Sequence, residues 1–132
     1  MSRNKIVIVG EAWGREEEQE QTAWVGMAGK LLKGLLSSVG INYYDCYATN
    51  VFNLRPQPSN DVSNLCGPKD QGIPHMKSLA SGKYVRAEYA PELQRLYKEI
   101  RNENPNLVLA LGGTALWALT GQSKINKYQH VT

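Results

Sequence analysis

The sequence has few cysteines and no long hydrophobic run. Of its 132 residues only two are cysteine, Cys46 and Cys66, and they form no Cys-x-x-Cys pair. Two isolated thiols supply too few ligands for an iron–sulfur cluster or a four-ligand zinc site, so we expect no metal and no cofactor. The longest apolar runs, such as Leu107–Leu111, are far shorter than the roughly 18 residues of a membrane span. Because no secretory signal is evident either, we expect a cytoplasmic protein with no membrane partner.

The charge of the chain is modest and unevenly distributed. The formal net charge is +3, and hydrophobic residues make up 42% of the chain, as in an ordinary globular protein. Residues 67–132 carry the excess of basic side chains, whereas residues 1–66 are slightly acidic. A mildly basic half is compatible with nucleic acid but does not demonstrate it. The length favours a single domain over residues 1–132.

Apolar runs and helical patterns alternate along the chain. Ile6–Val9 and Leu107–Leu111 lack polar alternation, which is typical of buried parallel strands, and Cys46–Phe52 fits a third strand. Three segments have the spacing or capping signals of helices: Leu31, Leu32, Leu35, Leu36 and Val39 before Gly40; the residues after Pro91; and Ala115–Leu119 with Thr114 as its N-cap. This order predicts an α/β fold with three layers, α/β/α, around a short central parallel sheet.

Residues 53–90 form a long stretch rich in proline, glycine, asparagine and serine. We expect it to be a loop insertion and the least regular part of the chain. Its basic residues are a candidate surface for a nucleic-acid backbone: Lys69, Lys77, Lys83 and Arg86. Three evident strands are few for this fold class, so we expect the domain to be incomplete at its C-terminal end.

Two motifs in the first third of the chain follow the first strand. Gly10-Glu11-Ala12-Trp13-Gly14 places a carboxylate at the strand's carboxyl end, where parallel sheets bind ligands. Its alternative interpretation is a structural turn with a solvated Glu11, and Glu16–Glu18 is expected to be a solvated acidic face. Trp24–Lys30 sets an aromatic ring before a glycine-rich helix start, which suits a flat ligand or a phosphate. Alternatively, Trp24 is a core residue.

Two further motifs follow the other strands. Asn50 precedes Arg55-Pro56, and its amide offers both a donor and an acceptor to a nucleobase edge, unless it is a turn residue. Leu109–Thr114 is a strand-to-helix turn at the same end of the sheet. We therefore predict that Glu11, Trp24 and Asn50 converge at one end of the parallel sheet.

In this order, the four motifs resemble the uracil-DNA glycosylase superfamily, most of all its bacterial and archaeal iron–sulfur type and glycosylase-like phage proteins. The resemblance covers most of residues 5–56 and 90–121. It implies the superfamily's fold, DNA containing uracil as the partner, and hydrolysis of the N-glycosidic bond after the base is flipped out of the stack.

The resemblance also implies a role for each matching position. Glu11 stands where the family has its water-positioning or structural acid, Trp24 replaces the phenylalanine that stacks on uracil, and Asn50 matches the asparagine that recognises the uracil edge. The implied substrate-binding residues are Gly10, Ala12, Trp13, Trp24, Gly26 and Asn50. The candidate DNA-binding residues are Lys30, Arg55, Lys69 and Lys77.

Several positions depart from the family pattern. Trp13 replaces a proline, and Leu54 stands at the place of a cluster cysteine, so no cluster is expected. The family's His-Pro-Ser/Ala motif has no match, since His130 lacks the following proline and His75 is expected to be a solvated residue of the insertion. We therefore predict weak or no glycosylase activity for this chain alone.

Two other hypotheses stay open at this point. One is a non-catalytic DNA- or protein-binding module of a phage replication or DNA polymerase system, in a bacterial or phage-infected cell. The other is a nucleotide-binding α/β protein that only mimics the motifs. As possible protein partners of this chain we consider a phage DNA polymerase and a separate C-terminal segment.

Overall fold

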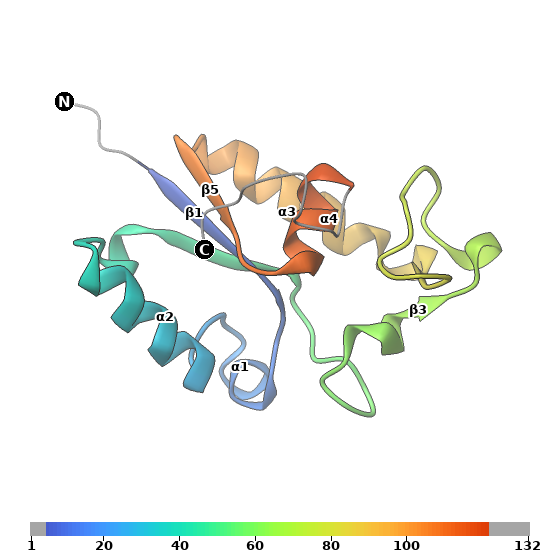
Figure 1. The fold of residues 1–132 in the computed structure, drawn as a ribbon, viewed down its shortest axis with the longest axis horizontal. Coiled ribbons are helices and arrows are strands. Elements are labelled where there is room, and N and C mark those ends of the chain that lie inside the picture. The colour runs from blue at the N-terminus through green and yellow to red at the C-terminus, as the bar shows by residue number, and fades with distance from the viewer. Residues whose placement is uncertain (1–4, 122–132) are drawn as a thin grey trace.

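The computed structural model describes residues 5–121 and contains a three-stranded parallel sheet. Its strand order is β2-β1-β5, with β1 (Ile6–Ala12) between β2 (Tyr47–Phe52) and β5 (Leu107–Ala110), as Figure 1 shows. The register pairs Gly10 with Asn50 on one side of β1 and Val9 with Ala110 on the other. The carboxyl ends of all three strands therefore meet at one edge, and the predicted sheet is confirmed.

Residues 5–121 contain four α-helices: α1 (Arg15–Glu20), α2 (Met27–Ser38), α3 (Ala90–Glu103) and α4 (Gly113–Thr120). In Figure 1, α2 lies on one side of the sheet, and α3 and α4 lie on the other. Ile8 packs toward α2, whereas Val7 and Val9 belong to the core of the α3–α4 side. Residues Ile6–Val9 of β1 are all apolar because both faces of the strand are covered there, and the predicted α/β/α layering is confirmed. Within residues 5–121, no helix is long and apolar enough to cross a membrane.

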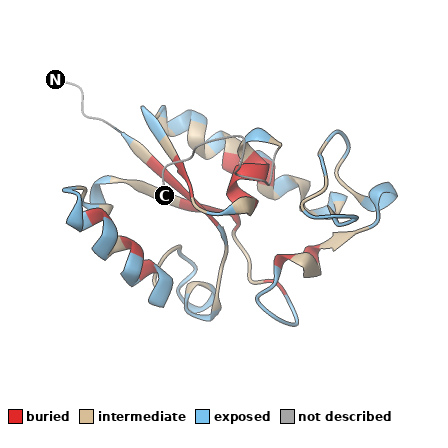
Figure 2. Ribbon diagram, viewed as in Figure 1, coloured by how far each residue is buried: buried red, intermediate tan, exposed pale blue. Residues whose placement is uncertain are grey.

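The α3–α4 side holds the larger core, and its buried residues gather in the sheet and in α4 (Figure 2). Helix α4 is buried almost all around, and Trp117 lies at its centre with no exposed surface. The indole Nε1 of Trp117 donates a hydrogen bond of 2.8 Å to the carbonyl of Lys77. This bond satisfies a buried donor and attaches residues 53–90 to the domain.

One detail of the predicted helices is wrong. Thr114 is not the N-cap of α4, because Gly112 takes that position with a φ of 94° and Thr114 lies inside the first turn. On α2, which confirms the helix predicted from the leucine spacing, the apolar residues are only partly buried: Leu32 and Leu36 contact the sheet, whereas Leu31 and Leu35 are 66% and 59% exposed. The apolar stripe of α2 is wider than the side of the helix that contacts the sheet, so part of the stripe remains exposed.

Residues 53–90 extend from the sheet on the side away from α2 in Figure 1. This segment contains short 3-10 turns and a small antiparallel ladder of β3 (Cys66–Gly67) and β4 (Tyr84–Val85). Although the segment is irregular, three of its side chains, Val62, Leu65 and Val85, are buried in the larger core. Residues 53–90, the segment predicted to be an insertion, are therefore packed against the domain.

Candidate functional site

Gly10, Trp24 and Asn50 meet at the carboxyl end of β1, on the side of the sheet that α2 covers. A Cβ atom on residue 10 would collide with Asn50 Oδ1 and with Cζ2 of the Trp24 ring. The position therefore tolerates only glycine without a shift of its neighbours. Asn50 is only 3% exposed, and no hydrogen bond within residues 5–121 reaches its side-chain amide. The buried Nε1 of Trp24 also has no partner among these residues.

The backbone around Trp24 is held by a carboxylate that the sequence analysis missed. Trp24 has a left-handed φ of 61°, which is uncommon for a residue other than glycine. Glu17 accepts hydrogen bonds from the N–H groups of Val25 at 2.9 Å, Gly26 at 2.6 Å and Gly14 at 3.0 Å. These bonds join α1 to the N-terminus of α2, where a negative charge also suits the helix dipole.

The expectation of a solvated acidic face over Glu16–Glu18 is therefore wrong for Glu17. Its side chain satisfies backbone donors that would otherwise lack a partner at the starts of two helices. The available signal was its spacing, because an acid three residues after Gly14 is the second half of a capping box.

Helix α3 braces the outer edge of β2 and so fixes the backbone of Asn50. The Arg95 guanidinium donates 2.8 Å hydrogen bonds to the carbonyls of Asn50 and of the residue after it, and forms an ion pair with Glu99. Glu99 in turn accepts from the hydroxyls of Tyr47 at 2.8 Å and Thr49 at 2.9 Å. Burial and the hydrogen bond to Glu99 raise the pKa of Tyr47 to about 12.

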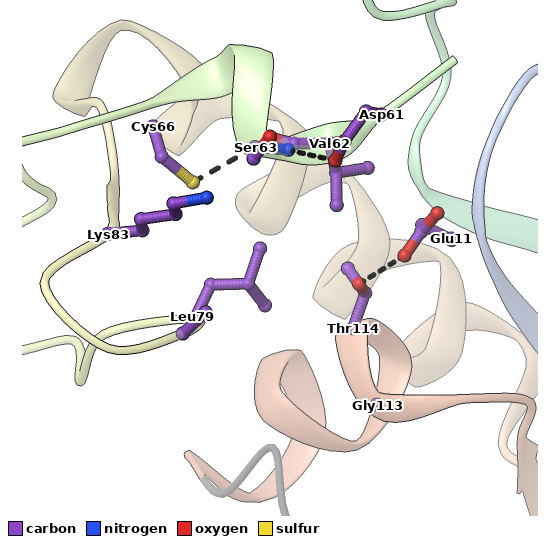
Figure 3. A pocket seen from close by; sticks show the side chains of 10 residues that line it. Glu11, Asp61, Val62, Ser63, Cys66, Leu79, Lys83, Gly113 and Thr114 are labelled. Carbon is purple, nitrogen blue, oxygen red and sulfur yellow. Dashed lines mark hydrogen bonds between the residues drawn. The ribbon is translucent and has the colours of Figure 1, made fainter.

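Glu11 points to the opposite side of β1, because successive side chains of a strand alternate between its two faces. Thr114 Oγ1 donates a 2.5 Å hydrogen bond to Glu11 Oε2. Both residues line a cavity of about 390 Å³ that also reaches Asp61, Ser63 and Lys83 of the insertion (Figure 3). Glu11 is exposed and faces a polar space, in contrast to the closely packed group around Gly10.

The structure therefore brings the three predicted site residues to one end of the sheet but divides them between two sides. Trp24 and Asn50 lie together, and Glu11 lies across β1 from them. Of the other candidates, Gly26 is buried at the start of α2, Ala12 packs against the larger core, and the Trp13 N–H donates to the carbonyl of Leu54 at 3.0 Å.

The four candidate DNA-binding residues are spread over the molecule. Lys30 is exposed on α2, while Lys69 and Lys77 are exposed on the insertion, at the opposite side of the view in Figure 1. Arg55 donates to Asn60 Oδ1 at 2.7 Å. His75 is exposed on the insertion, and His130 lies outside the described residues.

The two cysteines do not fit an iron–sulfur cluster, which takes four thiolate ligands. Each Sγ donates to a backbone carbonyl four residues earlier, Cys46 to Asn42 at 3.6 Å and Cys66 to Val62 at 3.7 Å. Burial raises the pKa of both thiols, which disfavours the thiolate that a metal needs. Among the described residues, no group of three or more histidine, cysteine or acidic side chains is placed to hold a metal ion.

The structure has a parallel sheet with polar and aromatic side chains at the carboxyl ends of its strands, and α/β domains bind their ligands at this edge. The profile of the uracil DNA glycosylase superfamily matches residues 2–131. The chain belongs to this superfamily.

Three similar proteins carry the name Type-4 uracil-DNA glycosylase. The one from Thermotoga maritima is 34% identical over 122 residues, which cover 92% of this chain and 52% of the relative. The one from Archaeoglobus fulgidus is 47% identical over 57 residues, covering 43% of this chain and 29% of the relative. The one from Saccharolobus solfataricus is 30% identical over 112 residues, covering 84% and 42%. This chain thus spans about half, or less, of the length of these relatives.

Proposed function

We propose that this protein acts on DNA containing uracil as a uracil-DNA glycosylase-like hydrolase. The observation that carries the proposal is the side-chain amide of Asn50, a residue only 3% exposed, which lies beside the Trp24 ring and makes no hydrogen bond to residues 5–121. Such an amide, at the carboxyl end of a parallel strand, is available to pair with a ligand. Its amide donor and acceptor complement O4 and N3–H of uracil, whereas cytosine reverses that pattern. Membership of the superfamily supports the same substrate.

In this proposal, the two sides of β1 divide the chemistry. The uracil lies beside Asn50 on the α2 side, and it enters only when the Trp24 ring moves away from Gly10, which it now touches. On the other side, Glu11 orients a water that attacks C1′ of the deoxyribose and takes its proton. The C1′–N1 bond breaks, its electron pair leaves with uracil, and an abasic site remains. The base must first be flipped out of the duplex.

We expect this chain alone to be weakly active. Leaving uracil carries negative charge, and a positioned donor near that charge is a large contribution to such reactions. Neither histidine of this sequence is followed by proline, so the pattern that supplies such a donor in the family is not matched. We propose that a C-terminal segment or a phage DNA polymerase is the partner that supplies this donor. We further propose that residues 1–132 form a single domain with an insertion at 53–90. Its proposed location is the cytoplasm of a bacterial or phage-infected cell.

A single-turnover assay on a uracil-containing oligonucleotide tests the proposal. The intact chain should release uracil slowly, and Asn50→Ala should lower uracil affinity by roughly 10–100-fold, because losing a buried polar contact costs about 1–3 kcal/mol. Asn102→Ala, an exposed asparagine on α3, is the matched control and should behave as the intact chain.

Rapid release by the intact chain would refute the need for a further segment. Equal release by the intact chain and Asn50→Ala would refute the role of Asn50. Tight binding of the oligonucleotide without any release would instead favour a non-catalytic DNA-binding module.

A further inference from the structure

One side of α2 carries an apolar stripe that the sheet does not cover. Met27 and Val39, at its two ends, are 85% and 70% exposed, and Leu31 and Leu35 between them are exposed as well. Because these positions are spaced by four residues, their side chains follow one another along a single side of the helix. In Figure 2, α2 lies on the outside of the molecule, and much of its ribbon has the colour of exposed residues. Single exposed apolar side chains are ordinary, whereas a contiguous group of them marks an interaction surface.

The stripe lies on the flank of α2 that faces β5. Leu36 contacts the sheet, and Ser37, the next residue, lines a cavity together with Tyr43 in the turn that leads into β2. Successive residues of a helix are about 100° apart, so Leu35, the residue before Leu36, lies on the opposite flank. That flank faces β5, because β2 and β5 lie on opposite sides of β1.

The outer edge of β5 adds to this surface. Among residues 5–121, only β1 pairs with β5. Leu107 is exposed and, like Leu109 two residues later, points to the α2 side of the sheet. The N–H groups of Leu107 and Leu111 donate to β1, so those of the alternate residues Val108 and Ala110 point to the outer edge. We call this edge and five exposed side chains the β5 edge surface: Met27, Leu31, Leu35, Val39 and Leu107.

The charges of the molecule favour a second copy of this chain on the β5 edge surface. None of the five side chains is charged, and Leu107–Ala110 holds no charge or proline of the kind that keeps an edge strand from pairing. The two lysines of α2, Lys30 and Lys33, point away from the stripe, and Lys33 lies 4.8 Å from the centre of the Tyr43 ring. Two copies therefore meet here without bringing like charges together. The outer edge of β2 differs, because the Arg95 guanidinium donates to two of its carbonyls.

A twofold axis beside β5 sets both parts of the surface against their equals. An antiparallel pairing of β5 with β5 of a second copy has such an axis perpendicular to the sheet, which leaves α2 of both copies on the same face. Because each stripe lies on the β5 flank of its helix, the two stripes then face each other across the axis. We propose that the β5 edge surface is the interface of an antiparallel dimer of this chain, in which two three-stranded sheets become one. The inference does not depend on the proposed function.

The size of the surface sets the strength of the dimer. Five apolar side chains of roughly 60–120 Å² each, with a short strand edge, bury less than the about 800 Å² per partner of a standard interface. We therefore expect a weak dimer, with a Kd on the order of 0.1 mM.

Sedimentation equilibrium at protein concentrations from about 10 µM to about 1 mM tests the dimer. The average mass should rise from the 14.7 kDa of one chain toward twice that value. Leu35→Glu places a charge in the stripe at an exposed position and should weaken the dimer by at least about tenfold. Tyr44→Glu is the matched control, because Tyr44 is an exposed apolar residue on the other flank of α2, and it should leave the dimer unchanged. Circular dichroism confirms that both variants fold.

Hydrogen exchange tests the strand edge in the unchanged protein. The amides of Val108 and Ala110 should exchange about fourfold more slowly at about 1 mM than at about 10 µM, since most chains are dimeric only at the higher concentration. The amide of Leu111, which donates to β1 in either state, should show no such change.

Three results would overturn the proposal. One is a mass of 14.7 kDa at every concentration, and binding of that monomer to vesicles of phosphatidylglycerol and phosphatidylcholine would then assign the stripe to a membrane surface. Another is equal weakening by Leu35→Glu and Tyr44→Glu, which would show a general effect of negative charge. The third is exchange at Val108 and Ala110 that does not depend on concentration in a protein that dimerises, which would exclude pairing at the edge of β5.

Discussion

The two sides of β1 differ sharply at the end of the strand, although the residues that face them are neighbours in sequence. On the α2 side, Trp24 and Asn50 lie so close to Gly10 that a single added carbon would collide with both. On the α4 side, Glu11 and Thr114 border an open polar cavity. Strand alternation alone produces this division, since one residue step moves a side chain to the other face. One strand end can therefore serve two chemically distinct sites.

The supporting layers differ in the same way. The α2 side is held by a small apolar cluster, and much of the outer stripe of α2 is exposed. The other side has two helices, the larger core and the insertion, which is anchored by Trp117 and Val85.

The largest effect is expected from Gly10→Ala, which tests how closely the α2 side of β1 is packed. Its methyl group would press on Asn50 and Trp24, so the free energy of unfolding should fall by about 1–3 kcal/mol, as for overpacking in general. Urea denaturation measures this change. Gly34→Ala is the matched control, because nothing lies within 4 Å of the added carbon on α2.

The control should be stabilised by about 0.5–1 kcal/mol, since alanine favours a helix over glycine. Equal stability of Gly10→Ala and the parent protein would show that the α2 side is as open as the α4 side, and would remove the basis of the comparison.

A smaller effect is expected from the hydrogen bond between Tyr47 on β2 and Glu99 on α3. The folded pKa of Tyr47 is raised from the ordinary 10.0 to about 12, so its contribution to stability is fully present below about pH 10 and is lost as the pH rises through about 12. The free energy of unfolding should therefore decline more steeply over this window in the parent than in Tyr47→Phe. Urea denaturation at several pH values compares them. Parallel declines would mean that the Tyr47–Glu99 hydrogen bond does not hold the strand edge.

The sequence predicted the strands well, because buried parallel strands are apolar on both faces and leave a clear signal, as in Ile6–Val9. It also indicated which residues lie at the strand ends. It could not predict that Glu17 and Arg95 hold those ends, since their partners are backbone groups that only the folded chain brings near. Thr114 has the pattern of an N-cap, but α4 begins two residues earlier than predicted, and the hydroxyl of Thr114 donates to Glu11 instead.

The central claim is that Asn50 and Glu11 serve different parts of one nucleotide, and calorimetric titration with free uracil tests it most directly. The parent protein, Asn50→Ala and Glu11→Gln are compared under the same conditions. The account predicts a loss of roughly 10–100-fold in uracil affinity for Asn50→Ala, from a buried polar contact of about 1–3 kcal/mol, and a change within about twofold for Glu11→Gln. A loss in Glu11→Gln as large as that in Asn50→Ala would contradict the division between the two sides of β1.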